Sequence, residues 1–307
     1  MGLLPSSIRL LATLHKEYSF SGPVCSLGNQ DIWASAAEVS DILAEVGCQA
    51  HSPAKVELHS SRTFQMDATL SSVSKEFVHA RTFFETMGLA DYLDMDKFDS
   101  DHPAILHDLN DPVPESLRNR FGLILDGGTV EHIFDMRQVF GNIVNMLRVN
   151  GCVLHIASFS IDHGLYGLSP TLFFDYYDRN GFDRMKCFLM EVDFSDITKS
   201  FRDRHRLVRY EYGMSLDGVL KAGVEVLVFF VARKVRQVAE TSVPTQGAYA
   251  RRGNLEDTQV AEQVSAFDQH VPAALRPVLS PLRPLARRLN RARQQAANRR
   301  QSHVGYI

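Results

Sequence analysis

Cysteine is scarce in this sequence, and no two cysteines have the spacing of a metal-binding or disulfide motif. The chain has four of them, and none belongs to a CxxC pair. Cys25 and Cys152 fall inside short apolar runs, where a cysteine usually packs as a small hydrophobic side chain. The sequence therefore predicts neither a disulfide framework nor a zinc centre. We accordingly expect no bound metal and a location in the reducing cytoplasm.

Long apolar stretches are missing as well. No run of about 18 apolar residues is present, so we expect no helix that spans a bilayer. The first residues lack the charged, apolar and small-residue pattern of a secretory leader, and none is expected. The 307 residues are 45% hydrophobic and 22% charged, with a net charge of −3. This composition is typical of a soluble globular protein with ample material for a core.

Acidic residues are absent after Asp268, whereas eight arginines follow it. We therefore divide the chain into a domain at 1–235 and a linker with a basic tail at 236–307, which is expected to be partly disordered or helical. The positive charges favour an anionic partner or a membrane surface, and a solvated tail without a partner is the simpler alternative. Tyr306 is the only aromatic residue after Asp268, so nucleic-acid binding is not strongly indicated.

The stretch FGLILDGGTVEHIFD, residues 121–135, carries the clearest local pattern. Its first five residues predict a strand that is buried on both faces. The glycine pair after Asp126 lets the backbone turn sharply and approach a ligand closely. Thr129 then offers an N-cap hydroxyl for a helix with Glu131 and His132 in its first turn. This pattern predicts a crevice at the carboxyl edge of a parallel sheet, and a tight turn with solvated polar residues is the alternative.

Strand and helix patterns alternate along most of the chain. Strands are predicted at 23–27, 90–93, 104–106, 121–125, 152–157, 185–192 and 224–233, and helices at 6–17, 35–47, 74–87, 135–148 and 169–181. Such alternation predicts an α/β fold with a parallel sheet covered by helices on both sides. Residues 48–88 interrupt the pattern as an insertion that is partly irregular and partly helical.

Carboxylates follow three of the predicted strands, at Asp94, Asp108 and Asp126. Because parallel strands end at the same edge of a sheet, we expect these side chains to converge. An acidic residue after the second strand of such a sheet commonly binds a ribose diol, which makes Asp94 a candidate, with a solvated loop as the alternative. The first strand is followed by a single glycine, Gly28, which is a weak nucleotide-binding pattern.

The order of elements, with the stretches FGLILDGGTVEHIFD, HDLNDPVP and HGLYGLSPTLFFDYYDRNGF, resembles the class I S-adenosylmethionine-dependent methyltransferases. More narrowly, it resembles a bacterial branch that reads "DGGTLEH" after the fourth strand and "GHGFYQFSPELFF" after the fifth. The resemblance covers about residues 22–235. It implies a doubly wound, mostly parallel seven-stranded sheet of the Rossmann-like methyltransferase type, whose last strand is antiparallel.

The resemblance also implies a set of contacts to S-adenosylmethionine. Gly28 would contact its methionine part, Asp94 its ribose, and Asp108 with Leu109 its adenine. The site for the methyl donor would be lined by Asp126 and Gly127. The first loop of this chain, Ser26-Leu27-Gly28-Asn29-Gln30-Asp31, departs from the acidic residue and GxGxG pattern of the family. A methyltransferase-like domain that serves as an inactive scaffold is therefore an alternative, and a nicotinamide-dependent oxidoreductase is a weaker one.

Two histidines are the candidate catalytic residues on the acceptor side, His132 and His163. An imidazole has an ordinary pKa of about 6.5 and can accept a proton from an acceptor hydroxyl at neutral pH. Asp162 and Tyr166, in the same loop as His163, are expected to bind the acceptor. His155 lies within a buried strand and is expected to be a satisfied core residue. The predicted function is transfer of a methyl group to an oxygen or nitrogen of a small-molecule or saccharide acceptor.

Overall fold

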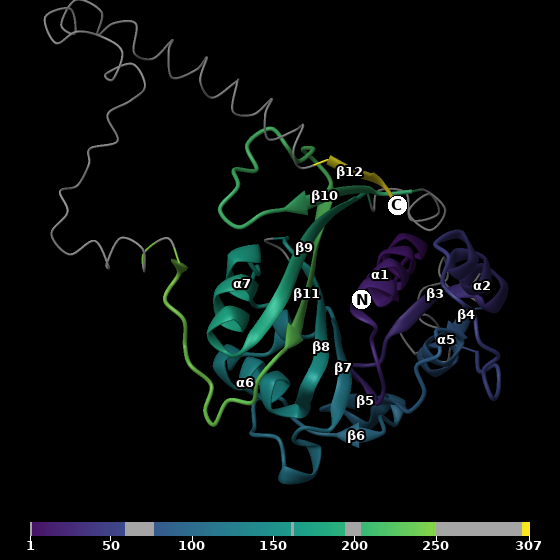
Figure 1. Cartoon of the computed structure of the whole chain (residues 1–307), viewed down its shortest axis with the longest axis horizontal. Helices are drawn as coiled ribbons and strands as arrows, with labels where there is room; N and C mark the ends of the chain where they lie inside the picture. The colour runs from purple at the N-terminus through teal and green to yellow at the C-terminus, as the bar shows by residue number, and fades with distance from the viewer. Residues whose placement is uncertain (1, 59–76, 161–162, 194–203, 248, 250–302) are drawn as a thin grey trace, which may run out of the picture.

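The computed structural model describes residues 2–58, 77–160, 163–193, 204–247, 249 and 303–307. Helices lie on both faces of a central nine-stranded sheet (Figure 1). In spatial order its strands are β12 (His303–Tyr306), β10 (Arg206–Tyr210), β9 (Phe182–Val192), β11 (Glu225–Lys234), β8 (Leu147–Ser158), β7 (Phe121–Gly127), β2 (Val24–Leu27), β5 (Tyr92–Asp96) and β6 (Ile105–Leu106). The predicted α/β class is therefore confirmed for the described part of the chain.

The half of the sheet from β8 to β6 is parallel. Cys25 in β2 pairs with Leu93 in β5 on one side and with Ile124 in β7 on the other. β7 in turn pairs in parallel with β8, and β5 with β6. The carboxyl ends of these strands consequently lie along one edge, as expected from the alternation of strands and helices.

The other half of the sheet is antiparallel, which corrects the prediction of a mostly parallel seven-stranded sheet. β11 runs antiparallel to both β8 and β9, β10 is antiparallel to β9, and β12 to β10. Half of the eight pairings are thus antiparallel. The additional strands β10 and β12 were not predicted because they are short and their charged and polar residues leave no apolar run of strand length.

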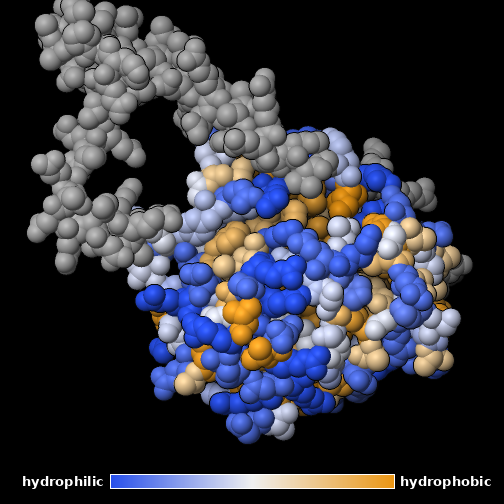
Figure 2. Space-filling model, viewed as in Figure 1, coloured by the Kyte–Doolittle hydropathy of each residue, from blue (hydrophilic) through white to orange (hydrophobic). Residues whose placement is uncertain are grey.

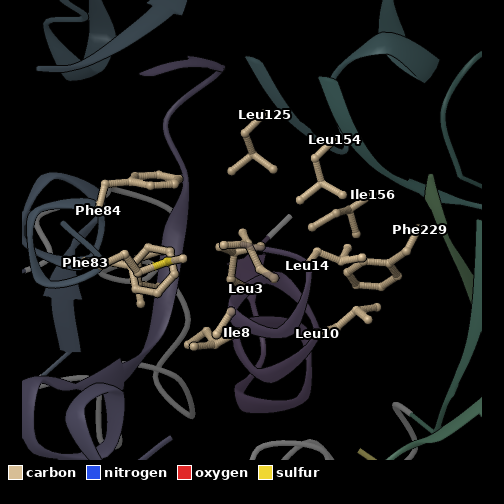
Figure 3. Close-up of a cluster of buried hydrophobic side chains, with 14 of the residues drawn as sticks. Leu3, Ile8, Leu10, Leu14, Phe83, Phe84, Leu125, Leu154, Ile156 and Phe229 are labelled. Carbon is tan, nitrogen blue, oxygen red and sulfur yellow. The ribbon is translucent and has the colours of Figure 1, made fainter. Parts of the chain in front are cut away.

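Alternating side chains of β7 and β8 are buried on opposite faces of the sheet. Leu125 and Leu154 belong to one hydrophobic cluster, whereas Ile124 and Val153 belong to the other. Helix α1 (Pro5–Tyr18) covers the first face, where its Leu14 lies close to Phe229 of β11 (Figure 3). The second face is covered by α6 (Met136–Met146) and α7 (Pro170–Arg179).

A small second sheet lies beside the first cluster. It consists of β1 (Gly2–Leu3), β3 (Asp31–Ser35) and β4 (Phe77–His79), and is accompanied by α2 (Ala36–Glu45) and α5 (Ala80–Thr86). α2 begins with a capping box, in which the Ser35 hydroxyl accepts from Glu38 N while the Glu38 carboxylate accepts from Ser35 N. The helix predicted at 74–87 is shorter, because residues 77–79 pair with β3 instead.

Residues 236–247 follow the antiparallel strand β11 and are hydrogen-bonded to α7 and its C-cap. The Asn180 amide donates to Ser242 O and accepts from Ser242 N, and Asp175 accepts from Gly247 N. Within the described ranges, no helix has the length and apolar character needed to cross a bilayer. The face in Figure 2 is mostly hydrophilic, with hydrophobic residues in separate patches. The arginines that follow Asp268 lie outside the described residues.

Candidate functional site

Asp126, near the end of β7, holds the turn that follows it. Its Oδ1 accepts hydrogen bonds from Thr129 N at 3.0 Å and Val130 N at 3.2 Å. Its Oδ2 lies 2.7 Å from Nδ1 of His155, and both side chains are fully buried. The structure therefore places the Asp126 carboxylate beneath the turn, where it shapes the backbone. Direct contact of Asp126 with a cofactor stays a prediction.

His155 is a satisfied core residue, as the sequence predicted. Its second ring nitrogen, Nε2, lies 2.6 Å from the hydroxyl of Tyr177, which is also fully buried. The three side chains of Asp126, His155 and Tyr177 form an internal hydrogen-bonded chain that joins β7, β8 and α7. Burial raises the pKa of Tyr177 well above its ordinary value, so its hydroxyl keeps its proton.

The glycine pair after Asp126 has two separate reasons to be glycine. A Cβ on Gly127 would overlap Oε1 of the buried Gln30 side chain. Gly128 has a φ of 86°, in the left-handed region that favours glycine. Gln30 belongs to the loop after β2, so the absence of a side chain at Gly127 lets the loops after β2 and β7 pack together.

The loop after β2 is held against the β7 turn by Thr129. The Thr129 hydroxyl donates to Leu27 O at 2.6 Å and makes no cap bond. The predicted helix start at Thr129 is therefore wrong: residues Val130–His132 form one 3-10 turn, and α6 begins at Met136 with Asp135 as its N-cap. Thr129 bonds to the neighbouring strand because Asp126 already satisfies the amides that a cap would serve.

A cavity of about 390 Å³ opens at the carboxyl ends of β2, β5 and β7. This size lies within the range of small-molecule sites, roughly 300–1,000 Å³. Its walls combine glycine turns, apolar side chains and a few polar groups. The residues most relevant to binding are Gly28, Asp96, Phe98, Leu109, Gly128 and His132. Phe98 is 65% exposed at this site, a large apolar ring that a ligand could cover.

The predicted acidic residues occupy different places around this cavity. Asp94 does not line it, and its Oδ1 accepts from Ala104 N at 2.9 Å. β5 continues to Asp96, past the predicted end at 93, so Asp96 is the carboxylate that reaches the cavity. Asp108 forms an ion pair with Lys97 at 2.7 Å, and this hydrogen bond lowers the pKa of Asp108 to about 2. Of the predicted adenine contacts, Leu109 lines the cavity.

The loop after β8 is fastened to the 3-10 turn. Glu131 O accepts hydrogen bonds from Leu165 N at 2.8 Å and Tyr166 N at 3.2 Å, and the Tyr166 hydroxyl donates to Phe134 O at 3.0 Å. Gly164 has a φ of 75° and lies against the Glu131 side chain, which a Cβ would approach at 3.0 Å. These contacts bring the predicted residues His132 and His163 together. Asp162 lies outside the described residues.

Glu131, His132 and His163 meet beside the cavity. The His132 and His163 rings have centroids 5.1 Å apart, and His163 Nε2 is 4.0 Å from Glu131 Oε1. The Glu131 side chain is fully buried, and burial, followed by the nearby Asp126, raises its pKa to about 7. Burial and then His163 lower the pKa of His132. One potential metal-ligating atom of each residue lies within 4.8 Å of the other two.

Sequence reasoning missed two residues of this arrangement, Glu131 and Asp96. Glu131 was interpreted only as a first-turn helix residue, although an acidic side chain next to His132 after a glycine pair is an available pattern. For Asp96 the sequence favoured a solvated acidic loop, because the predicted strand ended at 93, whereas β5 continues to Asp96. A second cavity, of about 500 Å³, lies over α6 and is lined mostly by polar side chains that include Arg118 and Glu240. It does not adjoin the strand ends.

The sequence matches no protein-family model and no curated protein. Among solved structures, YcgJ from Bacillus subtilis is 10% identical with a TM-score of 0.34, over 73% of this chain and 98% of that one. A Burkholderia thailandensis 1,6-didemethyltoxoflavin-N1-methyltransferase is 15% identical with a TM-score of 0.33, over 75% and 80%. Haemonchus contortus phosphoethanolamine N-methyltransferase 2 is 15% identical with a TM-score of 0.33, over 74% and 52%.

The Burkholderia and Haemonchus structures contain S-adenosylhomocysteine, and a similar structure, the branched-chain polyamine synthase from Thermus thermophilus, contains 5′-methylthioadenosine. At these identities and TM-scores, the likeness decides neither the activity nor the substrate of this chain.

Proposed function

We propose that this chain is an S-adenosylmethionine-dependent methyltransferase that acts on an oxygen or nitrogen of a small-molecule or saccharide acceptor. The observation that carries the proposal is the cavity at the carboxyl ends of β2, β5 and β7, with Asp96 and an exposed Phe98 on its wall and His132 at its border with His163. Ligands of open α/β sheets bind at this edge.

The residues around the cavity fit the parts of S-adenosylmethionine. Gly28 and Gly128 would let the backbone approach the cofactor, and the Asp96 carboxylate would accept from the ribose hydroxyls. Phe98 and Leu109 offer apolar surface for the adenine.

When bound, S-adenosylmethionine supplies a methyl group already activated by its positive sulfur. The protein then has to orient the acceptor and exclude water, which can contribute several kcal/mol, up to roughly 7–11 for ideal alignment. For a hydroxyl acceptor, the proton that the acceptor releases would go to a base of the protein. His132 is suited to this role because its lowered pKa keeps the imidazole neutral at pH 7.

We assign the acceptor to the side of the cavity covered by the loop after β8. At this side His163 Nε2 lies 4.0 Å from Glu131 Oε1, and the Tyr166 hydroxyl donates a hydrogen bond to Phe134 O. Both would contact the acceptor, together with Asp162.

The test is binding of S-adenosylhomocysteine to the full chain, by calorimetry and thermal unfolding. Ligand at 100 times Kd should stabilise the protein by about 2.7 kcal/mol. Asp96→Asn keeps an acceptor atom for Phe98 N but removes the charge, and should weaken binding at least about tenfold. Asp99→Asn is the matched control, because its side chain is 71% exposed and does not line the cavity, and it should bind normally.

The degenerate first loop favours a second candidate, an inactive methyltransferase-like scaffold. Only Gly28 supplies a glycine between Ser26 and Asp31, so fewer backbone amides can approach a cofactor closely. No binding of S-adenosylmethionine or S-adenosylhomocysteine at millimolar concentration would contradict the enzyme and support the scaffold.

A further inference from the structure

We propose that Glu131, His132 and His163 bind one divalent first-row transition-metal ion at the border of the cavity. Two imidazole nitrogens and one carboxylate oxygen are an established donor set for such ions. The donors come from two segments, the 3-10 turn after β7 and the loop after β8. The absence of CxxC spacing, on which the expectation of no metal rested, does not bear on a site of this composition.

The distances are close to those that one ion requires. Donor atoms bound at about 2.0–2.2 Å to one tetrahedral ion lie roughly 3.3–3.6 Å apart. His163 Nε2 and Glu131 Oε1, at 4.0 Å, are a few tenths of an ångström beyond this range. The full set, within 4.8 Å, has to contract by about 1 Å to bind one ion. His132 is exposed and the His163 side chain is 41% exposed, so a turn of the two rings can supply this movement.

The main chain holds the two donor segments together without any ion. Glu131 O accepts from both Leu165 N and Tyr166 N, so the loop that carries His163 is bonded to the residue that supplies the carboxylate. Gly164 permits this contact, because any larger residue would press on the Glu131 side chain. The site is thereby largely preorganised.

An unpartnered buried atom independently indicates a ligand. Glu131 is fully buried, and its Oε2 has no hydrogen-bond partner among the described residues. Its Oε1 receives a long bond from Ser158 N, at 3.4 Å. A buried carboxylate with so few donors is costly unless a cation or a proton compensates its charge. A metal ion held also by His132 and His163 supplies that compensation.

The donor set selects the kind of ion. Mg²⁺ and Ca²⁺ prefer sites made of oxygen atoms, whereas imidazole suits Zn²⁺, Co²⁺ and Fe²⁺. Three protein donors leave coordination positions open. Because His132 also lines the cavity, these positions would be accessible from it.

The role of the ion rests on the proposed function, although the site itself does not. An acceptor hydroxyl bound to the ion would lose its proton to solvent near neutral pH, as metal-bound water does. The oxygen would then form its bond to the methyl carbon while the carbon–sulfur bond breaks and its electron pair stays on sulfur. In this arrangement His132 and His163 hold the ion and do not act as bases.

The test uses the full chain freed of metal with a chelator. Titration with Co²⁺ should give the visible absorption of a bound ion, and calorimetry with Zn²⁺ should give one site per chain. Mg²⁺ should bind at least about a hundredfold more weakly than Zn²⁺. Glu131→Gln and His163→Ala should each weaken Zn²⁺ binding at least about tenfold. His102→Ala is the control, since its side chain is 86% exposed and pairs with Asp99 away from the cluster.

Binding of S-adenosylhomocysteine by the same variants separates the two proposals and checks their folding. Normal cofactor binding without one-to-one Zn²⁺ binding would overturn the metal site and leave the proposed function standing. The opposite result is a chain that binds no cofactor but binds one Zn²⁺, more weakly after Glu131→Gln or His163→Ala. It would overturn the proposed function and leave the metal site standing. Zn²⁺ affinity unchanged in a doubly substituted Glu131→Gln, His163→Ala protein would also overturn the site.

Discussion

At the end of β7, Gly127 faces the buried side chain of Gln30. The Gln30 amide donates to Leu27 O at 3.2 Å, which directs its oxygen to where a Cβ of residue 127 would stand. We expect Gly127→Ala to lower the free energy of unfolding by about 1–3 kcal/mol, because the new methyl group or the Gln30 side chain must shift in a packed interior.

A double-mutant cycle tests this origin of the effect. In a Gln30→Ala background the same Gly127→Ala change should cost at least about 1 kcal/mol less, since the overlapping atom is gone. Denaturant unfolding of the four proteins gives the coupling free energy. Additive effects would contradict the contact.

Lys234, the last residue of β11, is a buried cation that forms no ion pair with any acidic side chain among the described residues. Its Nζ donates to Val144 O and Leu147 O, both at 2.7 Å, and burial lowers its pKa to about 8 from 10.5. Between these two pH values the unfolded chain binds more protons than the folded one, so stability should rise with pH across this window. The shift corresponds to a gain of at most about 3 kcal/mol.

Lys234→Met provides the comparison, because cysteines and tyrosines titrate in the same range. The unfolding free energy of the wild type minus that of the variant, measured in urea at about pH 7.5 and about pH 10, should become more positive at the higher pH. An equal difference at both pH values would show that Lys234 does not titrate in this window.

Individual site residues were harder to predict than the edge at which they lie. The sequence predicted that Asp94, Asp108 and Asp126, after successive strands, would converge at one edge. Asp94 instead lies inside β5, and Asp96 at the end of this strand is the carboxylate that lines the cavity. Which carboxylate faces the cavity depends on where each strand ends and which amides lie nearby. Asp94 accepts from Ala104 N and Asp126 from Thr129 N and Val130 N. Contacts of this kind cannot be inferred from spacing along the chain.

At the scale of elements, the loop after β8 depends on one glycine. Gly164→Ala places a side chain at a φ of 75° and 3.0 Å from Glu131, and the left-handed conformation alone costs an alanine about 1–2 kcal/mol. We expect the amides of Leu165 and Tyr166 to exchange with solvent about tenfold faster.

Gly167→Ala is the matched control in the same loop. Its Cβ would meet only Ser160 O, at an ordinary 3.6 Å, and its φ is not in the left-handed region. Hydrogen exchange should therefore be nearly unchanged in this variant. Equal acceleration in both variants would mean that the loop is not held through Gly164.

Strands with continuous apolar sequences were predicted well, and short strands with charged residues poorly. β2, β7 and β8 are covered on both faces, so their sequences are almost continuously apolar. β10 is five residues long and carries arginines at positions 206 and 209, so its sequence shows no apolar run that would indicate a strand. The 3-10 turn at 130–132 could not be distinguished from a helix start, because both follow a threonine after glycine.

At the scale of the whole molecule, β12 links the last described residues to the beginning of the chain. Ile307 exchanges two backbone hydrogen bonds with His205, each at 3.0 Å, and Ile307 O also accepts from the Ser6 hydroxyl at 2.8 Å. Removing residues 303–307 should lower the free energy of unfolding by about 1.5–4.5 kcal/mol, because each of these three hydrogen bonds contributes roughly 0.5–1.5 kcal/mol.

The same deletion should leave β10 as an unpaired sheet edge, which favours association between chains. Light scattering at increasing protein concentration, together with denaturant unfolding, measures both effects. Unchanged stability and no association would show that β12 does not contribute to the sheet.

The positions of residues 236–247 and of β12 have a consequence for the arginines between them. Ser242 and Gly247 are hydrogen-bonded beside α7, and β12 pairs with β10. Both flanks of the segment that contains these arginines are thus attached to the same domain. An anionic partner that bound these arginines and drew them away from the domain would therefore oppose the pairing of β12 with β10.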